Sequence, residues 1–302
     1  MNNTSNSLVS GIDPASFSAV TGPSQDLFRF VNGPWVDMYR LPDDRSRYGS
    51  FDKLAEDAEN QIRDILEEDD CPAVKSRALY HSFLDVDAID AAGLAAIEDQ
   101  LASIDETEDK AALTRALGAM NPTGGPDLIG IAVYGDPGAP ETNVVHIEQD
   151  GLDLPDEAYY REDHYAPIRE AYVEMVAKQL KNAHLAADDE DAHAQAKRFL
   201  DVETRIAANH WDNVSTRDSV KTYNPTDYAD LCAMLADVDL DAWIDAWQNA
   251  YDATTAAAVQ PLDFRGCFSH TIVHEPSFLT GLNAFWKEAS LDDLKLWAAC
   301  MW

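Results

Sequence analysis

Two histidines near the end of the chain have a spacing that could hold a metal ion. His270 and His274 are separated by Thr-Ile-Val, and Glu275 and Pro276 follow directly. Histidines at positions i and i+4 bind one zinc ion when they share a helix face, and a neighbouring glutamate then acts on the metal-bound water. Thr-Ile-Val is typical of a strand, however, and Pro276 prevents a continuous helix through Glu275. We therefore predict no metal site at these residues.

The other groups that could do chemistry form no catalytic pattern. Serine nucleophile elbows, phosphate-binding loops and the G-x-G-x-x-G pattern are absent from the sequence. The acidic runs at 67–70 and 188–191 are typical of solvated helix ends rather than of paired catalytic carboxylates. The remaining histidines lack metal-ligand spacing: His81, His146, His164, His184, His193 and His210. We expect no catalytic residue and no metal ligand in this chain.

The elements that would position any site are mainly helical. Apolar residues recur at helical spacing, which predicts helices over 51–66, 74–83, 91–104, 108–120, 164–182 and 188–210. Thr107 is the expected N-cap of the fourth of these helices. Further helices are expected to begin at Pro225 and Pro276, because proline suits the first helical turn. The strand-like runs are 127–134, 143–149 and 271–274, and the first two should form an antiparallel pair.

The last predicted helix has an apolar face that nothing in the sequence is obviously left to cover. Its members are Leu291, Leu294, Trp297, Cys300 and Met301, and no Gly, Asn or Pro stop follows them before Trp302. Exposed apolar patches promote association. We therefore expect the chain to be truncated here and to associate when isolated.

The most informative segment is Asp26 to Leu54, DLFRFVNGPWVDMYRLPDDRSRYGSFDKL. It predicts an aromatic-rich helix interrupted at 32–34, a stop at Pro42, and a second helix that Ser50 caps. The segment resembles the N-terminal signature of the neprilysin-like (endothelin-converting-enzyme-like) zinc metallopeptidases. In their bacterial members a D-x-[FL]-x-[FY]-x-N-G-x-W block precedes a Pro and an R-Y-G-x-F-D-x-L block.

Five further blocks follow in the family's order, so the resemblance extends from about Pro14 to Leu294. They are LYHSFLD, GLDLPDEAYY, VETRIA, RDSVKTYNP and IVHEPSFL. The resemblance implies a mainly α fold, the multi-helix N-terminal lid domain of these peptidases, with a small antiparallel β-hairpin. It also implies zinc as the cofactor of the full-length enzyme. The family's H-E-x-x-H motif is absent from this chain, so its ligands would lie elsewhere.

The resemblance also implies substrate contacts in the R-Y-G-x-F-D block. There the Arg is associated with the carboxylate end of short peptides and the Phe with the main specificity pocket. These roles fall on Arg47, Phe51 and, more loosely, Asp52. A guanidinium can bind a terminal carboxylate bidentately. Ala55 stands where the family often has a second basic residue. In the alternative interpretation, Phe51 belongs to a core and Arg47 pairs with a nearby acid.

Composition limits the classes of partner. The chain of 302 residues has 55 acidic and 22 basic residues, a net charge of −33, which disfavours nucleic acid and anionic membrane surfaces as partners. No basic and apolar leader and no run of about 20 apolar residues is present. The four cysteines are scattered, which favours free thiols in a reducing compartment. We expect a cytoplasmic protein.

Two functional hypotheses follow. The first is the N-terminal part of a zinc metalloendopeptidase that cleaves oligopeptides. This part would be inactive by itself. Its partners would be peptide substrates and a missing C-terminal catalytic domain. The second is a stand-alone, non-catalytic helical module that binds peptides or another chain. The predicted domains are a flexible N-terminal extension over residues 1–22 and a helical domain over 23–302 that is incomplete at its C-terminal end. The second hypothesis differs from the first in whether the chain truly ends at Trp302.

Overall fold

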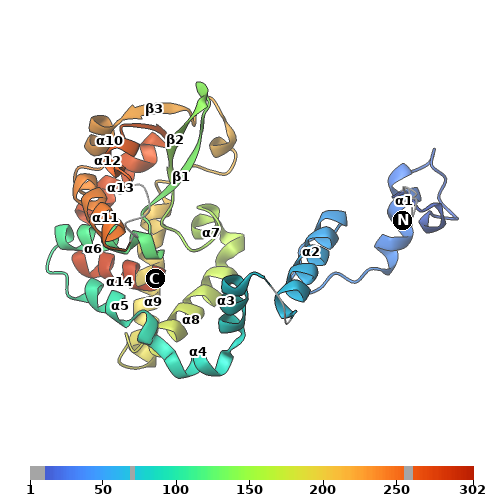
Figure 1. Ribbon diagram of the computed structural model, residues 1–302, viewed down its shortest axis with the longest axis horizontal. Coiled ribbons are helices and arrows are strands. Elements are labelled where there is room, and N and C mark those ends of the chain that lie inside the picture. The colour runs from blue at the N-terminus through green and yellow to red at the C-terminus, as the bar shows by residue number, and fades with distance from the viewer. Residues whose placement is uncertain (1–10, 69–71, 255–260) are drawn as a thin grey trace. The chain divides into compact units, whose positions relative to one another are not determined.

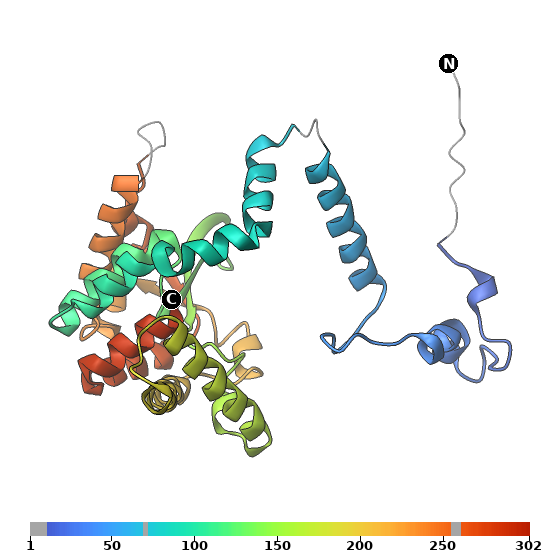
Figure 2. The same ribbon diagram turned by 90° about the horizontal axis from the view of Figure 1, so that it is seen from below.

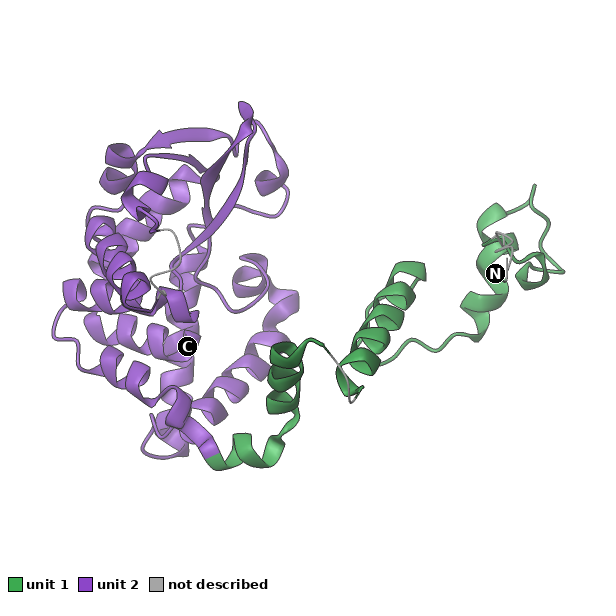
Figure 3. Ribbon diagram, in the orientation of Figure 1, with its two compact units in different colours: residues 1–91 green, residues 92–302 purple. Residues whose placement is uncertain are grey.

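The computed structural model describes residues 11–68, 72–254 and 261–302 (Figure 1). The chain divides into two compact units, unit 1 (residues 1–91) and unit 2 (residues 92–302), which Figure 3 distinguishes by colour. Helices predominate in both. The predicted boundary between an extension over 1–22 and a domain over 23–302 stays a prediction.

Unit 1 consists of helices. Its elements are the 3-10 turn η1 (Pro14–Ser16), α1 (Leu27–Met38), α2 (Ser50–Glu67), α3 (Val74–Leu84) and most of α4 (Val86–Ala92). The side chain of Asp26 caps α1 by accepting a hydrogen bond from the Arg29 backbone N–H. The predicted N-cap of α2 is wrong by one residue, because the helix begins at Ser50 itself and Gly49 precedes it without a side-chain cap.

The predicted interruption of α1 at residues 32–34 is also wrong, since the helix continues through Pro34 to Met38. A proline inside a helix leaves the carbonyl four residues earlier without its helical donor. Here that carbonyl belongs to Phe30, and it accepts a hydrogen bond of 2.7 Å from the backbone N–H of Ser18. The ring of Phe17 packs on Phe30 in the same place. The segment before α1 therefore provides the hydrogen bond that the proline removes.

The helices of unit 2 agree with most of the predicted segments. They are α5 (Glu98–Asp105), α6 (Lys110–Met120), α7 (Ala158–Arg161), α8 (Ala166–Asn182), α9 (Asp189–Ala207), α10 (Tyr228–Met234), α11 (Leu240–Thr254), α12 (Phe264–Cys267), α13 (Pro276–Glu288) and α14 (Leu291–Met301). Short 3-10 turns lie between them: η2 (Gly93–Ala96), η3 (Asn121–Thr123), η4 (Asp163–Tyr165) and η5 (Ser215–Arg217).

Two local predictions in unit 2 are corrected. The single helix predicted over 91–104 is divided among the end of α4, η2 and α5. Thr107 does not cap α6. Its hydroxyl donates to the Ile104 carbonyl at the end of α5, and the side chain of Asp109 caps α6 by accepting from the Ala112 N–H at 2.7 Å. Thr107 lies two residues before Asp109, the N-cap of α6.

The sheet of unit 2 contains the predicted hairpin and two more strands. Its strands are β1 (Ile129–Asp136), β2 (Ala139–Gln149), β3 (Asn224–Asp227) and β4 (His270–Val273), in the order β1-β2-β4-β3. The antiparallel pairing of β1 with β2 is confirmed, while β4 joins β2 in parallel and β3 pairs antiparallel with β4. The helix expected at Pro225 is wrong, because this proline lies in the edge strand β3, where a missing N–H disturbs no ladder. Helix α10 begins later, at Tyr228.

The core of unit 2 covers the apolar face of the last helix. Leu294 and Trp297 are fully buried, and α14 contacts α5, α6 and α9. Figures 1 and 2 show α14, in red, against α9. The Trp297 indole N–H donates to the Gly151 carbonyl at 3.2 Å. The prediction that this face stays uncovered is wrong for Leu294 and Trp297, and Leu291, Cys300 and Met301 are partly buried against the same core. The partners come from segments that lie far away in the sequence.

The close approach of two helices in unit 2 depends on a glycine. Helices α6 and α11 meet at Gly118, where an added Cβ would lie 2.3 Å from the Trp243 carbonyl oxygen. Any larger residue would force the two backbones apart. The cysteines of the described part, Cys232, Cys267 and Cys300, are free thiols, and Cys71 lies outside the described residues.

Candidate functional site

The three residues that the sequence assigns to substrate line one hollow in unit 1. This hollow, of about 390 Å³, forms where the turn before α2 meets the first turns of that helix. Arg47, Phe51 and Asp52 share it with Arg45, Tyr48, Gly49, Ser50, Ala55, Glu56 and Glu59. The structure therefore brings the predicted set together on one short segment.

The side chains of this hollow are free to meet a ligand. Phe51 is 87% exposed, so it is not a core residue of unit 1. Among the residues that the structure describes, Arg47 has no hydrogen-bond or ion-pair partner, and it makes no ion pair with Asp52. An exposed phenyl ring beside an unpaired guanidinium can pack on an apolar side chain while the guanidinium binds a carboxylate. The roles of Arg47, Phe51 and Asp52 stay predictions.

The residues on both sides of Arg47 are fixed by Glu56. The Tyr48 hydroxyl donates to Glu56 Oε2 at 2.7 Å, and Arg45 Nη2 lies 3.5 Å from Glu56 Oε1. The bond to the carboxylate raises the pKa of the Tyr48 hydroxyl to about 12. Tyr48 also stacks on Tyr39, which stacks on Trp35 of α1. The turn that carries Arg47 is thus anchored by a carboxylate and by an aromatic stack.

The strand predicted at 271–274 is confirmed as β4, His270–Val273, and it separates the two histidines that have metal-ligand spacing. His270 Nε2 faces Asp136 Oδ2 at 3.5 Å, whereas His274 lies beyond the end of β4. Among the described residues, no group of three His, Cys, Asp or Glu side chains is placed to hold a metal ion. The described part of this chain therefore does not fit a zinc site.

Sequence reasoning missed a histidine pair. His146 Nδ1 and His274 Nε2 lie 2.9 Å apart, although 128 residues separate them. His274 Nδ1 faces Glu148 Oε1 at 3.7 Å, which favours the tautomer in which the His146 Nδ1–H donates to His274 Nε2. Burial lowers the pKa of His274. The buried Nε2 of His146 has no partner among the described residues. The pair joins β2 to the residue after β4.

A buried glutamate explains why two of the sequence blocks occur together. Glu203, of the block VETRIA, accepts from the Asp153 backbone N–H at 2.7 Å and from the Tyr172 hydroxyl at 2.8 Å. Asp153 belongs to the block GLDLP, so this carboxyl holds the turn after β2 against α8 and α9. Burial raises the pKa of Glu203 to about 7. In the sequence, Glu203 stands at helical spacing beside apolar positions. This spacing was the one sign that its carboxyl is buried.

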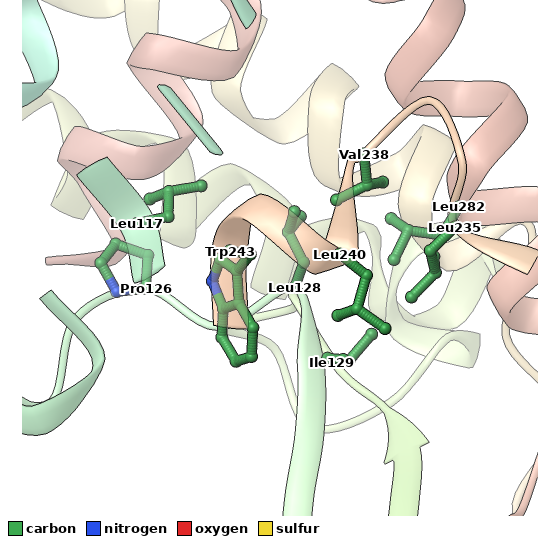
Figure 4. Close-up of a pocket in the computed structure, with 9 residues that line it drawn as sticks. All are labelled: Leu117, Pro126, Leu128, Ile129, Leu235, Val238, Leu240, Trp243 and Leu282. Atoms are coloured by element: carbon green, nitrogen blue, oxygen red, sulfur yellow. The ribbon is translucent and has the colours of Figure 1, made fainter. Parts of the chain in front are cut away.

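A small cavity in the core of unit 2 is not a binding site. It has a volume of about 20 Å³ and is lined by apolar residues alone: Leu117, Pro126, Leu128, Ile129, Leu235, Val238, Leu240, Trp243 and Leu282 (Figure 4). The space is about that of one water molecule. It is a packing defect of the core.

Comparison with known proteins places the chain in a family. The N-terminal model of Peptidase family M13 matches residues 23–301. This chain belongs to peptidase family M13. Human neprilysin is 25% identical over 298 residues, which are 92% of this chain and 39% of neprilysin. Mouse membrane metallo-endopeptidase-like 1 is 26% identical over 212 residues, which are 63% of this chain and 28% of that protein.

Solved structures agree with the M13 assignment. The *Mycobacterium tuberculosis* zinc metalloprotease Zmp1, in complex with an inhibitor, is similar with a TM-score of 0.82 and 31% identity over 97% of this chain and 43% of Zmp1. PepO from Lactobacillus rhamnosis HN001 shares the fold, with a TM-score of 0.70 and 19% identity over 93% of this chain and 42% of PepO. The predicted resemblance and the mainly helical M13 N-terminal fold are confirmed.

This M13 chain spans only part of the length of its relatives. It spans 39% of human neprilysin and 43% of Zmp1. In the described parts, no helix combines the length and apolar character that crossing a membrane requires.

Proposed function

We propose that this chain is the N-terminal, substrate-contacting part of a zinc-dependent metalloendopeptidase that cleaves oligopeptides. Its M13 membership supports a peptidase. The observation that carries the proposal is the hollow of unit 1, in which the unpaired Arg47 lies beside the exposed Phe51. The zinc ligands belong to the part of the M13 relatives that this chain does not span. Zinc supplies the hydrolytic chemistry there, and this chain alone is inactive.

In this proposal Arg47 binds the C-terminal carboxylate of a short peptide. The guanidinium can donate two parallel hydrogen bonds to a carboxylate, and no protein carboxylate among the described residues competes for it. Phe51 packs on the substrate side chain that follows the scissile bond, and Asp52 lines the same hollow. Because Ala55 adds no second positive charge, Arg47 provides the main attraction.

The partners follow from the same reasoning. Peptide substrates and the zinc-bearing catalytic part are the proposed partners. The net charge of −33 makes nucleic acids and anionic membranes poor partners, and we propose a cytoplasmic location. An alternative function is a stand-alone, non-catalytic helical module that binds peptides or another chain.

The test uses the longer peptidase and two matched peptides, one with a free C-terminal carboxylate and one amidated. Arg47→Ala should raise KM about ten- to a hundredfold for the free acid and leave the amide nearly unchanged, because a charge-assisted contact is worth about 1.5–3 kcal/mol. Arg63→Ala, on the same helix but outside the hollow, is the control for the lost charge. Equal effects on both peptides would make Arg47 a structural residue.

The same variants distinguish the alternative function. A stand-alone module should bind the free-acid peptide without any additional polypeptide, which calorimetry on this chain measures. Binding that Arg47→Ala abolishes, with no hydrolysis in the longer protein, would favour the module. Hydrolysis with the KM difference described above would favour the peptidase.

A further inference from the structure

Glu56 contacts residues on both sides of Arg47 without contacting Arg47 itself. Its Oε2 accepts from the Tyr48 hydroxyl, and its Oε1 lies 3.5 Å from Arg45 Nη2. Glu56 lies in the second turn of α2, so these contacts fold the turn before the helix back onto it. The positions of residues 45 and 48 are tied to one carboxylate, and residue 47 lies between them.

The same contacts leave the Arg47 guanidinium free. Glu56 is an acid that lines the hollow and could neutralise Arg47. Its two oxygens instead contact the Tyr48 hydroxyl and the guanidinium of Arg45. Glu56 therefore pairs with Arg45 and not with Arg47. An arginine without a protein partner is the one that can bind an incoming carboxylate.

A second anchor acts on Tyr48 from the other side. Its ring stacks on Tyr39 at 4.7 Å between centroids, and Tyr39 stacks on Trp35 at 4.6 Å. Such pairs contribute beyond their buried area. Because the stack fixes the ring and Glu56 fixes its hydroxyl, Tyr48 cannot rotate freely, and the backbone of its neighbour Arg47 is restrained.

We propose that Glu56 is a positioning residue that holds Arg47 in place for the C-terminal carboxylate of a peptide, acting through Tyr48 and Arg45. This inference rests on the proposed function. Glu56 touches no substrate. Removal of the Glu56 carboxylate releases the turn that carries Arg47 from α2. Arg47 then adopts orientations in which it does not bind the peptide carboxylate.

The test compares variants of the longer peptidase on the free-acid and amidated peptides. Glu56→Ala should raise KM for the free acid about three- to tenfold, the value of one net hydrogen bond, with kcat and the amide unchanged. Glu56→Gln keeps an acceptor for Tyr48 and should recover most of the loss. Asp57→Ala is the matched control, because Asp57 pairs with Lys53 on the same helix and does not line the hollow. It should change neither KM.

A double variant separates positioning from direct binding. In an Arg47→Ala background, Glu56→Ala should have no further effect on the free acid, because the group that it positions is gone. Tyr48→Phe removes only the hydroxyl and keeps the stack, so it tests the same link if Glu56→Ala fails to fold. Hydrogen exchange on this chain should show faster exchange of the amides of residues 46–49 in Glu56→Ala.

The outcomes distinguish this inference from the proposed function. If Arg47→Ala affects the free acid selectively but Glu56→Ala and Tyr48→Phe do not, Glu56 is not a positioning residue and the carboxylate role of Arg47 stands. If Arg47→Ala itself shows no selectivity, both ideas are wrong. Equal KM increases for acid and amide in Glu56→Ala would indicate a general structural role and overturn the inference.

Discussion

Helices α9 and α2 are similar in sequence pattern and opposite in environment. Each is an amphipathic helix, of 19 and 18 residues, with apolar residues at helical spacing. In unit 2, α9 buries Phe199, Val202 and Ile206 completely or nearly so. In unit 1, Phe51, Leu54, Ile62 and Ile65 of α2 are more than half exposed, and Gly33 is the one buried residue in the described part of the unit. Periodicity specifies a helix, and burial requires a partner.

This difference has a consequence for the proposed substrate contacts. The hollow around Arg47 lies in the unit that lacks a core, so core packing does not hold it. Its geometry depends on local contacts, namely the carboxylate of Glu56 and the aromatic stack. Such contacts are individually small in free energy. Unit 2, by contrast, holds its turns with buried groups such as Glu203.

Hydrogen exchange should give the largest difference between the units. Amides of α9 and α13 should exchange only through global unfolding, whereas amides of α2 and α3 should exchange through local opening, because their apolar faces are not packed. We expect protection in unit 2 to exceed that in unit 1 by about 10³-fold or more, measured on this chain by mass spectrometry. Equal protection would mean that the apolar faces of the unit 1 helices are packed, and the contrast between α9 and α2 would be wrong.

The next largest difference between the units should come from the truncation of a tryptophan in each. Trp297→Ala removes a fully buried side chain and its hydrogen bond to Gly151, and should lower the free energy of unfolding by about 3–5 kcal/mol. Trp35→Ala, at a residue 43% exposed in α1, is the matched control and should cost less than about 1 kcal/mol. Denaturant unfolding of both variants measures this. Similar losses would contradict the assignment of the core to unit 2 alone.

The pH dependence of stability gives the smallest effect. The folded pKa of Glu203, about 7, lies above its ordinary value of 4.5, so the folded state binds this proton more tightly. Its contribution to stability is complete below about pH 4.5 and is lost as the pH rises through 7. Glu203→Gln should remove this loss, on the order of 1–3 kcal/mol between pH 5 and 8.

Two controls make the pH experiment specific. The first is wild-type protein, measured over the same pH range as Glu203→Gln. His210 contributes with the opposite sign, because burial lowers its pKa to about 4, and its stabilisation is lost as the pH falls below 6.5. His210 is present in the wild type and in Glu203→Gln. Its contribution therefore cancels when the two stability profiles are subtracted. A profile of Glu203→Gln that parallels the wild type would show that Glu203 is ionised in the folded state.

Much of the local structure was predictable from the sequence. Helical spacing placed α2, α3, α8 and α9, and β-branched runs placed β1 and β2, because these patterns depend on residues that lie close together in the chain. The block order around Arg47 and Phe51 predicted the family. It also predicted that these residues and Asp52 lie on one short segment, since five residues separate the outermost two. Local chemistry was sufficient for these predictions.

Long-range contacts were decided by the tertiary structure alone. The parallel pairing of β4 with β2, the contact of His146 with His274, and the cover over Trp297 join segments more than 100 residues apart. Local periodicity indicates that a helix face is apolar or that a strand can form. Which faces meet depends on the free energy of burying them together, and on close approaches such as that of Gly118 to the Trp243 carbonyl. The sequence therefore determined the elements and the family, and packing determined their partners.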